Sequence, residues 1–207
     1  MIDVLDTIKR LKKNLINKLH RPLDGLFFCL YDSHISHSHR SFVMNIFVTN
    51  ACPIKSAQDH CNVHNVKMIL EASQLLSTAH FVLDGIQVGY KPTHRNHPSA
   101  IWTRSTSANY QWLYAHFKAL CSEYTFRTGK IHKTSELLSV LDKLPCNIKK
   151  AELEPFAMCM DDEYKRLGIF DQTTAYKTYL KNKFSEWACR EKPIKVQWTN
   201  RKQPTWV

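Results

Sequence analysis

Residues 56–85 read SAQDHCNVHNVKMILEASQLLSTAHFVLDG, and this stretch decides the expected fold. At about 100° per residue, most of its polar side chains fall on one narrow strip of a helix. Most other directions carry apolar or small residues, so the helix is expected to be buried almost all round. The sequence therefore predicts one long helix over 56–85, with a polar strip made of His60, His64, Lys67, Glu71, Gln74 and Thr78.

The polar strip has two interpretations. Unpaired buried charge is costly, so these side chains must meet each other, a cleft or a ligand. An imidazole, an ammonium and a carboxylate in one strip could perform acid–base or Schiff-base chemistry. Alternatively, Lys67 pairs with Glu71 at i, i+4 and His64 is hydrogen-bonded beside them, which is a purely structural network. On the strip alone, the structural interpretation is favoured.

Composition and charge narrow the class of protein. The 207 residues suit one domain with an appendage, and only five glycines favour helices. A formal net charge of +11 indicates a polyanionic partner such as nucleic acid, although a merely basic protein remains open. Seven cysteines without a signal peptide or a membrane-length apolar run predict reduced thiols and a cytoplasmic protein, in the host cytosol if it is viral.

A metal site is not expected. Cys61 and His64 have a C-x-x-H spacing, and His60 lies one turn before His64, but a second paired half-site is lacking. No glycine-rich phosphate loop appears either. We therefore predict neither a metal nor a cofactor.

The chain divides at Met44. Residues 1–43 are expected to hold an amphipathic helix over 1–20, which docks or, less favoured, binds a membrane surface, followed by a connector. Residues 44–207 are expected to form one helical domain that begins with a strand-like run. Further helices are predicted over 108–127, capped by Gly129, over 134–141 and over 172–190, with loops elsewhere, including the basic stretch 90–107.

From Met44 to Val207 the chain resembles the phage pyrimidine-dimer DNA glycosylases of the endonuclease V type. The family places a histidine seven residues before its catalytic glutamate, and His64 and Glu71 have that spacing. The resemblance rests on short sequence pieces that occur in the same order as in the family: MNIF, DHCNVHNVKMILE, NHPSAIW, EYTFRTGK, DDEYK and QPTW. With this resemblance, the catalytic interpretation of the polar strip is favoured over the structural one.

The resemblance implies an all-α, compact helical bundle in which the N-terminal segment threads between helices. It also implies a DNA repair glycosylase for damaged or modified pyrimidines, with strand cleavage as an AP lyase. Glu71 would be the catalytic carboxylate, and His64 would orient the substrate or stabilise an intermediate. The partner would be a lesion-bearing DNA duplex, with no membrane, and the protein would be a monomer.

One departure from the family concerns the nucleophile. The family attacks C1′ with the α-amine of its mature N-terminus, whereas the matching segment at Met44 and Asn45 is internal here. Three outcomes are open: the active chain begins near Met44, a lysine such as Lys67 supplies the amine, or glycosylase activity is lost. The alternatives to a glycosylase are a non-catalytic nucleic-acid-binding protein and a base- or nucleotide-modifying enzyme that reuses the fold.

DNA contacts are expected from basic side chains in the loop before the 108–127 helix and at that helix's end. Phosphate binding suits such groups, although for any single one of them a solvated surface charge is the favoured interpretation. The predicted set is Arg95, His97, Arg104, Arg127 and Lys130.

Overall fold

The computed structural model describes residues 44–169 and 171–207. Over these residues it contains seven α-helices, one 3-10 helix and no strand, so the all-α prediction is confirmed. The amphipathic helix predicted over 1–20 and its connector lie outside the described residues, and the domain division at Met44 stays a prediction. The helices are α2 (Pro53–Asp59), α3 (Asn62–Asp84), α4 (Pro98–Ser105), α5 (Ser107–Thr128), η1 (Lys133–Leu137), α6 (Leu138–Leu141), α7 (Asp162–Leu167) and α8 (Gln172–Ala188).

The single helix predicted over 56–85 is wrong, because the chain breaks at His60 and Cys61. Both residues have extended backbone angles, with ψ values of 133° and 165°. The carbonyls freed at the end of α2 find distant partners: the indole of Trp198 donates to the Asp59 carbonyl at 2.9 Å, and Arg127 donates to the His60 carbonyl at 2.6 Å. Helix ends need such partners, and no local sequence pattern showed that they existed.

The surface of α3 also differs from the prediction of a helix buried all round. His64 and Glu71 are buried, but Val63, Val66 and Leu70 are 38–45% exposed. Lys67 is exposed on the same side. His64 and Glu71 of the polar strip therefore point into the protein, and Lys67 lies at its surface. The apolar side chains of Val63, Val66 and Leu70 face outward.

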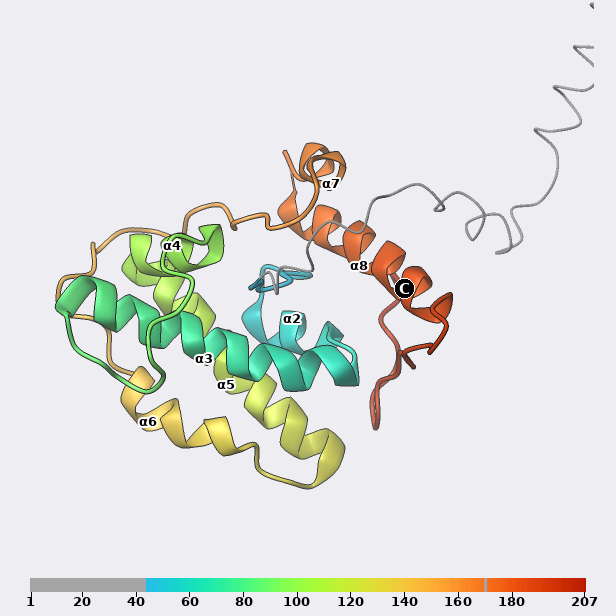
Figure 1. Cartoon of the computed structure of the whole chain (residues 1–207), viewed down its shortest axis with the longest axis horizontal. Helices are drawn as coiled ribbons and strands as arrows, with labels where there is room; N and C mark the ends of the chain where they lie inside the picture. The colour runs from blue at the N-terminus through green and yellow to red at the C-terminus, as the bar shows by residue number, and fades with distance from the viewer. Residues whose placement is uncertain (1–43, 170) are drawn as a thin grey trace, which may run out of the picture. The chain divides into compact units, whose positions relative to one another are not determined.

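Helix α5 is the main support for α3, and Figure 1 shows the two crossing in the middle of the molecule. Its N-terminus is capped by the Thr106 hydroxyl, which accepts from the Asn109 N–H at 3.1 Å. Gly129 ends it with φ 69°, a left-handed conformation that glycine adopts without penalty. The predicted 108–127 helix and its glycine cap are therefore confirmed. Its core-facing side chains include Tyr110, Leu113, Phe117 and Leu120.

Two short helices were not predicted from the sequence. Helix α4 lies within the stretch read as a loop; Pro98 occupies its first turn, and His97 Nδ1 accepts from the Ser99 N–H at 3.2 Å. Helix α7 is only six residues long. Neither helix has the apolar periodicity from which a helix is predicted, because each is only about two turns long.

The segment 44–49 is buried and forms neither a helix nor a strand. It touches three parts of the fold: the Asn45 N–H meets Glu71 on α3, the Thr49 N–H donates to Ser56 on α2 at 3.2 Å, and Phe47 packs on Tyr179 of α8. The segment thus threads between helices, as the family resemblance implies. Side chains, rather than a neighbouring strand, satisfy its backbone.

Helix α8 and the residues after it close the far side of this segment. Trp198 is buried, and the Trp206 indole donates to the Asp59 carboxylate at 3.2 Å. Both tryptophans therefore pack against other parts of the protein. In the described part of the chain, no helix combines the length and apolarity that crossing a membrane requires.

Candidate functional site

The predicted catalytic residues of α3 meet the threading segment at one carboxylate. The Asn45 backbone N–H donates to Glu71 Oε2 at 3.0 Å, and Lys67 Nζ lies 3.2 Å from Glu71 Oε1. Glu71 is 8% exposed, so both of its oxygens are engaged inside the protein. The tertiary structure thus brings the predicted carboxylate and the predicted position of the family's amine to hydrogen-bonding distance.

Asn45 is held so that its backbone nitrogen has one position. Its Oδ1 accepts from the Tyr176 hydroxyl at 2.9 Å and from the Ile46 N–H at 2.8 Å, and its Nδ2 donates to the Cys159 carbonyl at 2.8 Å. Burial raises the pKa of Tyr176, which keeps its hydroxyl protonated as a donor. A site that must present one nitrogen to one carboxylate needs this kind of support.

Backbone strain is located at the same place. Phe47 has φ 53°, a left-handed conformation that is costly for a residue with a bulky side chain. Its ring centroid lies 4.9 Å from that of His64 and 6.1 Å from that of Tyr179. Such strain costs on the order of 1–3 kcal/mol, persists only where packing enforces it, and is frequent at functional sites.

His64 is a neutral imidazole in this site. Its ring packs 4.9 Å from Trp187 and 5.6 Å from Phe184, and the residue is 2% exposed. Burial lowers its pKa to about 3, and the nearby ammonium groups of Lys183 and Lys67 add to the shift. At neutral pH His64 can therefore orient a substrate through hydrogen bonds but does not offer a positive charge.

Lys183 of α8 also lies at this site, although no pattern in the sequence selects it. Its Nζ donates to the Tyr179 hydroxyl at 3.3 Å and lies 5.5 Å from the centre of the Phe47 ring. About a hundred residues separate α3 from α8 in the sequence. The tertiary fold brings the two helices together, and no residue spacing in the sequence indicates that it does. The i, i+4 pairing of Tyr179 and Lys183 is the only local signal, and it is common on helices.

His60 does not share the α3 strip, because the chain breaks after α2, but its ring still contacts that of His64. The centroids of His60 and His64 are 6.1 Å apart, and those of His60 and His116 are 5.4 Å apart. Both ring nitrogens of His60, Nδ1 of His64 and Nε2 of His116 have no hydrogen-bond partner among the described residues. We call these three residues the histidine cluster. In the part of the chain that the structure covers, no three His, Cys, Asp or Glu side chains are arranged to hold a metal ion.

The basic loop, which lies within residues 90–107, is hydrogen-bonded to α3, the helix that carries Glu71. Thr78 Oγ1 accepts from the Thr93 N–H at 3.2 Å and also contacts the Thr93 carbonyl at 3.3 Å. Arg95 is exposed and lies over the Phe81 ring at 4.6 Å, while Arg104 donates to the Arg95 carbonyl at 2.7 Å. Arg95 and Arg104 therefore lie together, whereas His97 serves as the cap of α4.

The other two predicted DNA-binding residues lie elsewhere. Helix α5 has 22 residues and so extends about 33 Å, which separates Lys130 beyond its C-terminus from Arg104 just before its N-terminus. Lys130 is exposed, and its role in DNA binding stays a prediction. The five residues thus do not form one cluster.

Arg127 is buried in a structural network. Its guanidinium donates to Glu123 at 3.1 Å, to the His60 carbonyl at 2.6 Å and to the Gln58 carbonyl at 3.0 Å. Arg201 also pairs with the Glu123 carboxylate. With 5% of its surface exposed and its donors occupied, Arg127 joins α5 to the break between α2 and α3, and we do not retain it as a phosphate ligand.

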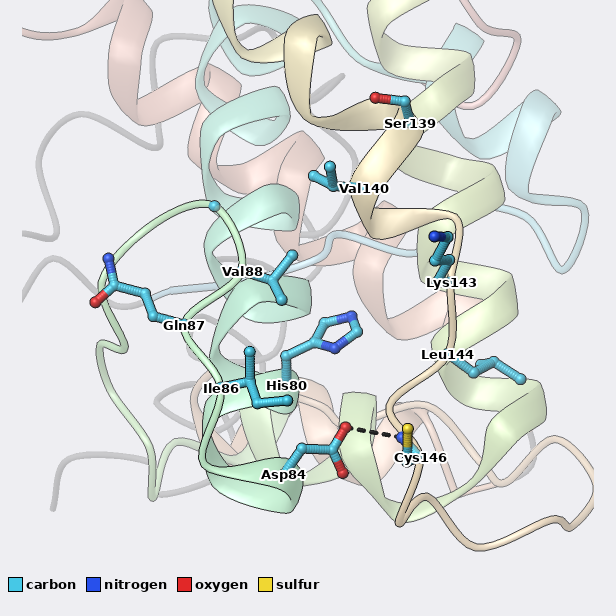
Figure 2. A pocket seen from close by; sticks show the side chains of 11 residues that line it. His80, Asp84, Ile86, Gln87, Val88, Ser139, Val140, Lys143, Leu144 and Cys146 are labelled. Carbon is cyan, nitrogen blue, oxygen red and sulfur yellow. Dashed lines mark hydrogen bonds between the residues drawn. The ribbon is translucent and has the colours of Figure 1, made fainter.

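A hollow of about 500 Å³ lies away from this chemistry. Figure 2 shows it beside His80 and Asp84 at the end of α3, where the Asp84 carboxylate accepts from the Cys146 N–H at 2.7 Å. His80 is nine residues beyond Glu71, or about 14 Å along the helix. A second hollow of about 600 Å³, between the end of α8 and the C-terminal residues, is not lined by Glu71 either. We place the candidate site at Glu71, because the Asn45 N–H and the Lys67 ammonium both meet this one carboxylate.

One family model matches part of this chain. The family model for pyrimidine dimer DNA glycosylases matches residues 44–137, a segment of the chain. No curated protein and no solved structure matches the chain. The matched segment contains Asn45, His64, Lys67 and Glu71, while α7, α8 and the C-terminal residues lie outside it. The pieces DDEYK and QPTW of the proposed resemblance are therefore not covered by the match.

Proposed function

We propose that this protein excises a damaged pyrimidine from DNA, with Glu71 as the catalytic carboxylate. The proposal rests on one observation above all: the backbone nitrogen of Asn45 lies 3.0 Å from Glu71 Oε2. Both residues are buried, and hydrogen bonds hold the Asn45 side chain in place. The family match over 44–137 supports the same substrate class, because that family acts on pyrimidine dimers in DNA.

In this proposal the site residues have separate tasks. Glu71 would assist departure of the base and then accept a proton, which a carboxylate can do when water is largely excluded. His64 would orient the substrate as a neutral imidazole. In the chain as printed the Asn45 nitrogen is an amide, which is not a nucleophile, whereas a chain that begins at Asn45 would carry a primary amine at this position.

The DNA would approach from the side of the basic loop. Arg95 and Arg104 lie next to each other, and the loop is fixed to α3 by Thr78. Arginine side chains in such a loop would contact phosphates and set the register of the duplex. The damaged nucleotide or its partner would leave the stack, because the sugar is not accessible to a buried carboxylate otherwise.

An excision assay tests the proposed function. We expect duplex DNA with a pyrimidine dimer to gain abasic sites when it is incubated with the full chain, and undamaged duplex to remain intact. A variant released by proteolysis so that it begins at Asn45 should excise faster if the α-amine is the main nucleophile. Intact-mass measurement of the natively expressed protein then identifies which N-terminus occurs. DNA binding without excision by either form would leave a non-catalytic binding protein, and activity on free nucleotides would indicate a nucleotide-modifying enzyme.

Binding to duplex DNA is expected to weaken steeply as salt is added. Each neutralised phosphate contributes about −0.9 to the slope of log K against log salt. Neutralising two loop cations, in a Lys91→Gln and Arg95→Gln double variant, should therefore make the slope shallower by about 1.8. Fluorescence anisotropy over a salt series measures this slope. The matched control replaces exposed Lys118 and Lys192 by Gln, and an equal loss of slope in that control would show that the loop is not the binding surface.

A further inference from the structure

Lys183 lies among three aromatic rings, one of which is that of Phe47 in the threading segment. Its Nζ lies 5.3 Å from the centre of the Tyr179 ring, 5.5 Å from that of Phe47 and 5.8 Å from that of Trp187. Tyr179 Oη is its hydrogen-bond partner at 3.3 Å. The rings remove water from the amine, and one of them belongs to the same threading segment that presents Asn45 to Glu71.

The two lysines of the site differ in their partners. Lys67 forms an ion pair with Glu71, and 44% of its side chain is exposed. Lys183 is half-buried and forms no ion pair with any described residue, while the nearby Glu186 is paired with Arg190. Of the two amines, Lys183 therefore has the less water and the less compensating charge.

The surrounding charges act on Lys183 from both helices. Burial lowers its pKa, and the ammonium of Lys67 on α3 and the guanidinium of Arg190 on α8 lower it further. Glu186 and Glu71 oppose these effects and raise it. Desolvation next to a second cation is the arrangement that gives lysine side chains the neutral, nucleophilic form used in Schiff-base chemistry.

We propose that Lys183 is a nucleophilic amine of this site, which forms an imine with the sugar of an abasic nucleotide. The inference rests on the proposed function and adds a residue that lies outside the segment matched by the family. It also gives the full-length chain an amine where the Asn45 nitrogen is an amide.

The proposed step conserves atoms and charge. The neutral Lys183 amine adds to the C1′ aldehyde of the ring-opened sugar and forms a carbinolamine. A proton taken up from solvent lets the carbinolamine hydroxyl leave as water, which gives a protonated imine. Glu71 then removes a proton from C2′, and the electron pair of that C–H bond forms the C2′–C3′ double bond. The 3′ phosphate leaves with the C3′–O electrons, so the strand is cut by elimination rather than by hydrolysis.

Borohydride trapping of the full chain tests this proposal. Borohydride delivers hydride to the imine carbon and leaves a stable secondary amine, so the protein stays linked to an abasic-site duplex. We expect peptide mapping of the adduct to place the modification on Lys183. Lys183→Arg retains a cation among the rings but cannot form an imine, and it should lower trapping at least about 100-fold while preserving the circular dichroism melt. Lys183→Met provides a second variant that keeps the apolar part of the side chain, and Lys181→Met is the matched control on the same helix.

The outcomes separate this inference from the proposed function. An adduct on Lys183, lost in both Lys183 variants and kept in Lys181→Met, supports the inference. Excision with the adduct on another residue, or full trapping by Lys183→Arg, overturns the role of Lys183 and leaves the glycosylase proposal standing. If the wild type neither excises a lesion nor forms an adduct, the proposed function fails and the inference fails with it.

Discussion

Glu71→Gln is expected to abolish base excision while leaving the fold and DNA binding close to those of the wild type. Gln keeps the shape of the side chain and an oxygen that can accept from the Asn45 N–H, but it cannot accept a proton. Loss of general acid–base catalysis typically costs on the order of 10²–10⁴-fold in rate. Stability should change by less than about 1 kcal/mol, since the Lys67 side chain is 44% exposed and its ammonium can turn to water.

Excision rate and melting temperature, measured on the same sample, distinguish catalysis from structure. Glu152→Gln is the matched control, because Glu152 is exposed and does not contact the Asn45 nitrogen. Unchanged excision per folded molecule in Glu71→Gln, together with a large drop in stability, would show that the Lys67–Glu71 pair serves only the fold. Lys67→Ala on the same assay then reports whether that lysine contributes to the chemistry.

The protein is expected to unfold in mild acid because of the histidine cluster. Burial lowers the pKa of His64 to about 3 and that of His116 to about 4, and it lowers the pKa of His60 well below its usual value. These imidazoles are neutral when folded, whereas the unfolded chain binds protons below pH 6.5. Their contribution to stability is therefore complete above pH 6.5 and is lost as the pH falls towards 4.

The expected loss is large relative to the total stability of a domain. Each proton taken up only by the unfolded chain lowers the free energy of unfolding by about 1.4 kcal/mol per pH unit, so His64 and His116 together account for about 6 kcal/mol between pH 6.5 and 4. Typical domains have about 5–15 kcal/mol in total. Urea denaturation over this pH range measures the loss directly.

One cluster member can be removed to test the assignment. Neither ring nitrogen of His60 has a described hydrogen-bond partner, so His60→Leu removes a titrating group without breaking a bond. Its stability should fall less steeply below pH 6.5, by about 1.4 kcal/mol per pH unit. His94→Gln, at an exposed position outside the cluster, should behave like the wild type. A wild-type stability that stays flat down to pH 4.5 would contradict buried, neutral imidazoles.

The sequence alone determined the helical class and the identity of the polar residues on α3. Periodicity fixed the long helix that carries His64 and Glu71, and Gly129 marked the end of α5, because both signals depend on residues within one or two turns. The seven-residue spacing of His64 and Glu71 likewise predicted their shared helix face, and the structure buries both.

Only the tertiary structure decided what those residues meet. The break after α2 depends on Trp198 and Arg127, which bind freed carbonyls from 139 and 67 residues away. The 3.0 Å contact of Asn45 with Glu71, the burial of Arg127 and the position of Lys183 over the Phe47 ring likewise depend on segments distant in the chain. Local patterns encode helices through nearest-turn interactions, whereas the surroundings of a side chain are made by long-range packing. For that reason the contacts of the Glu71 carboxylate became visible only in the folded protein.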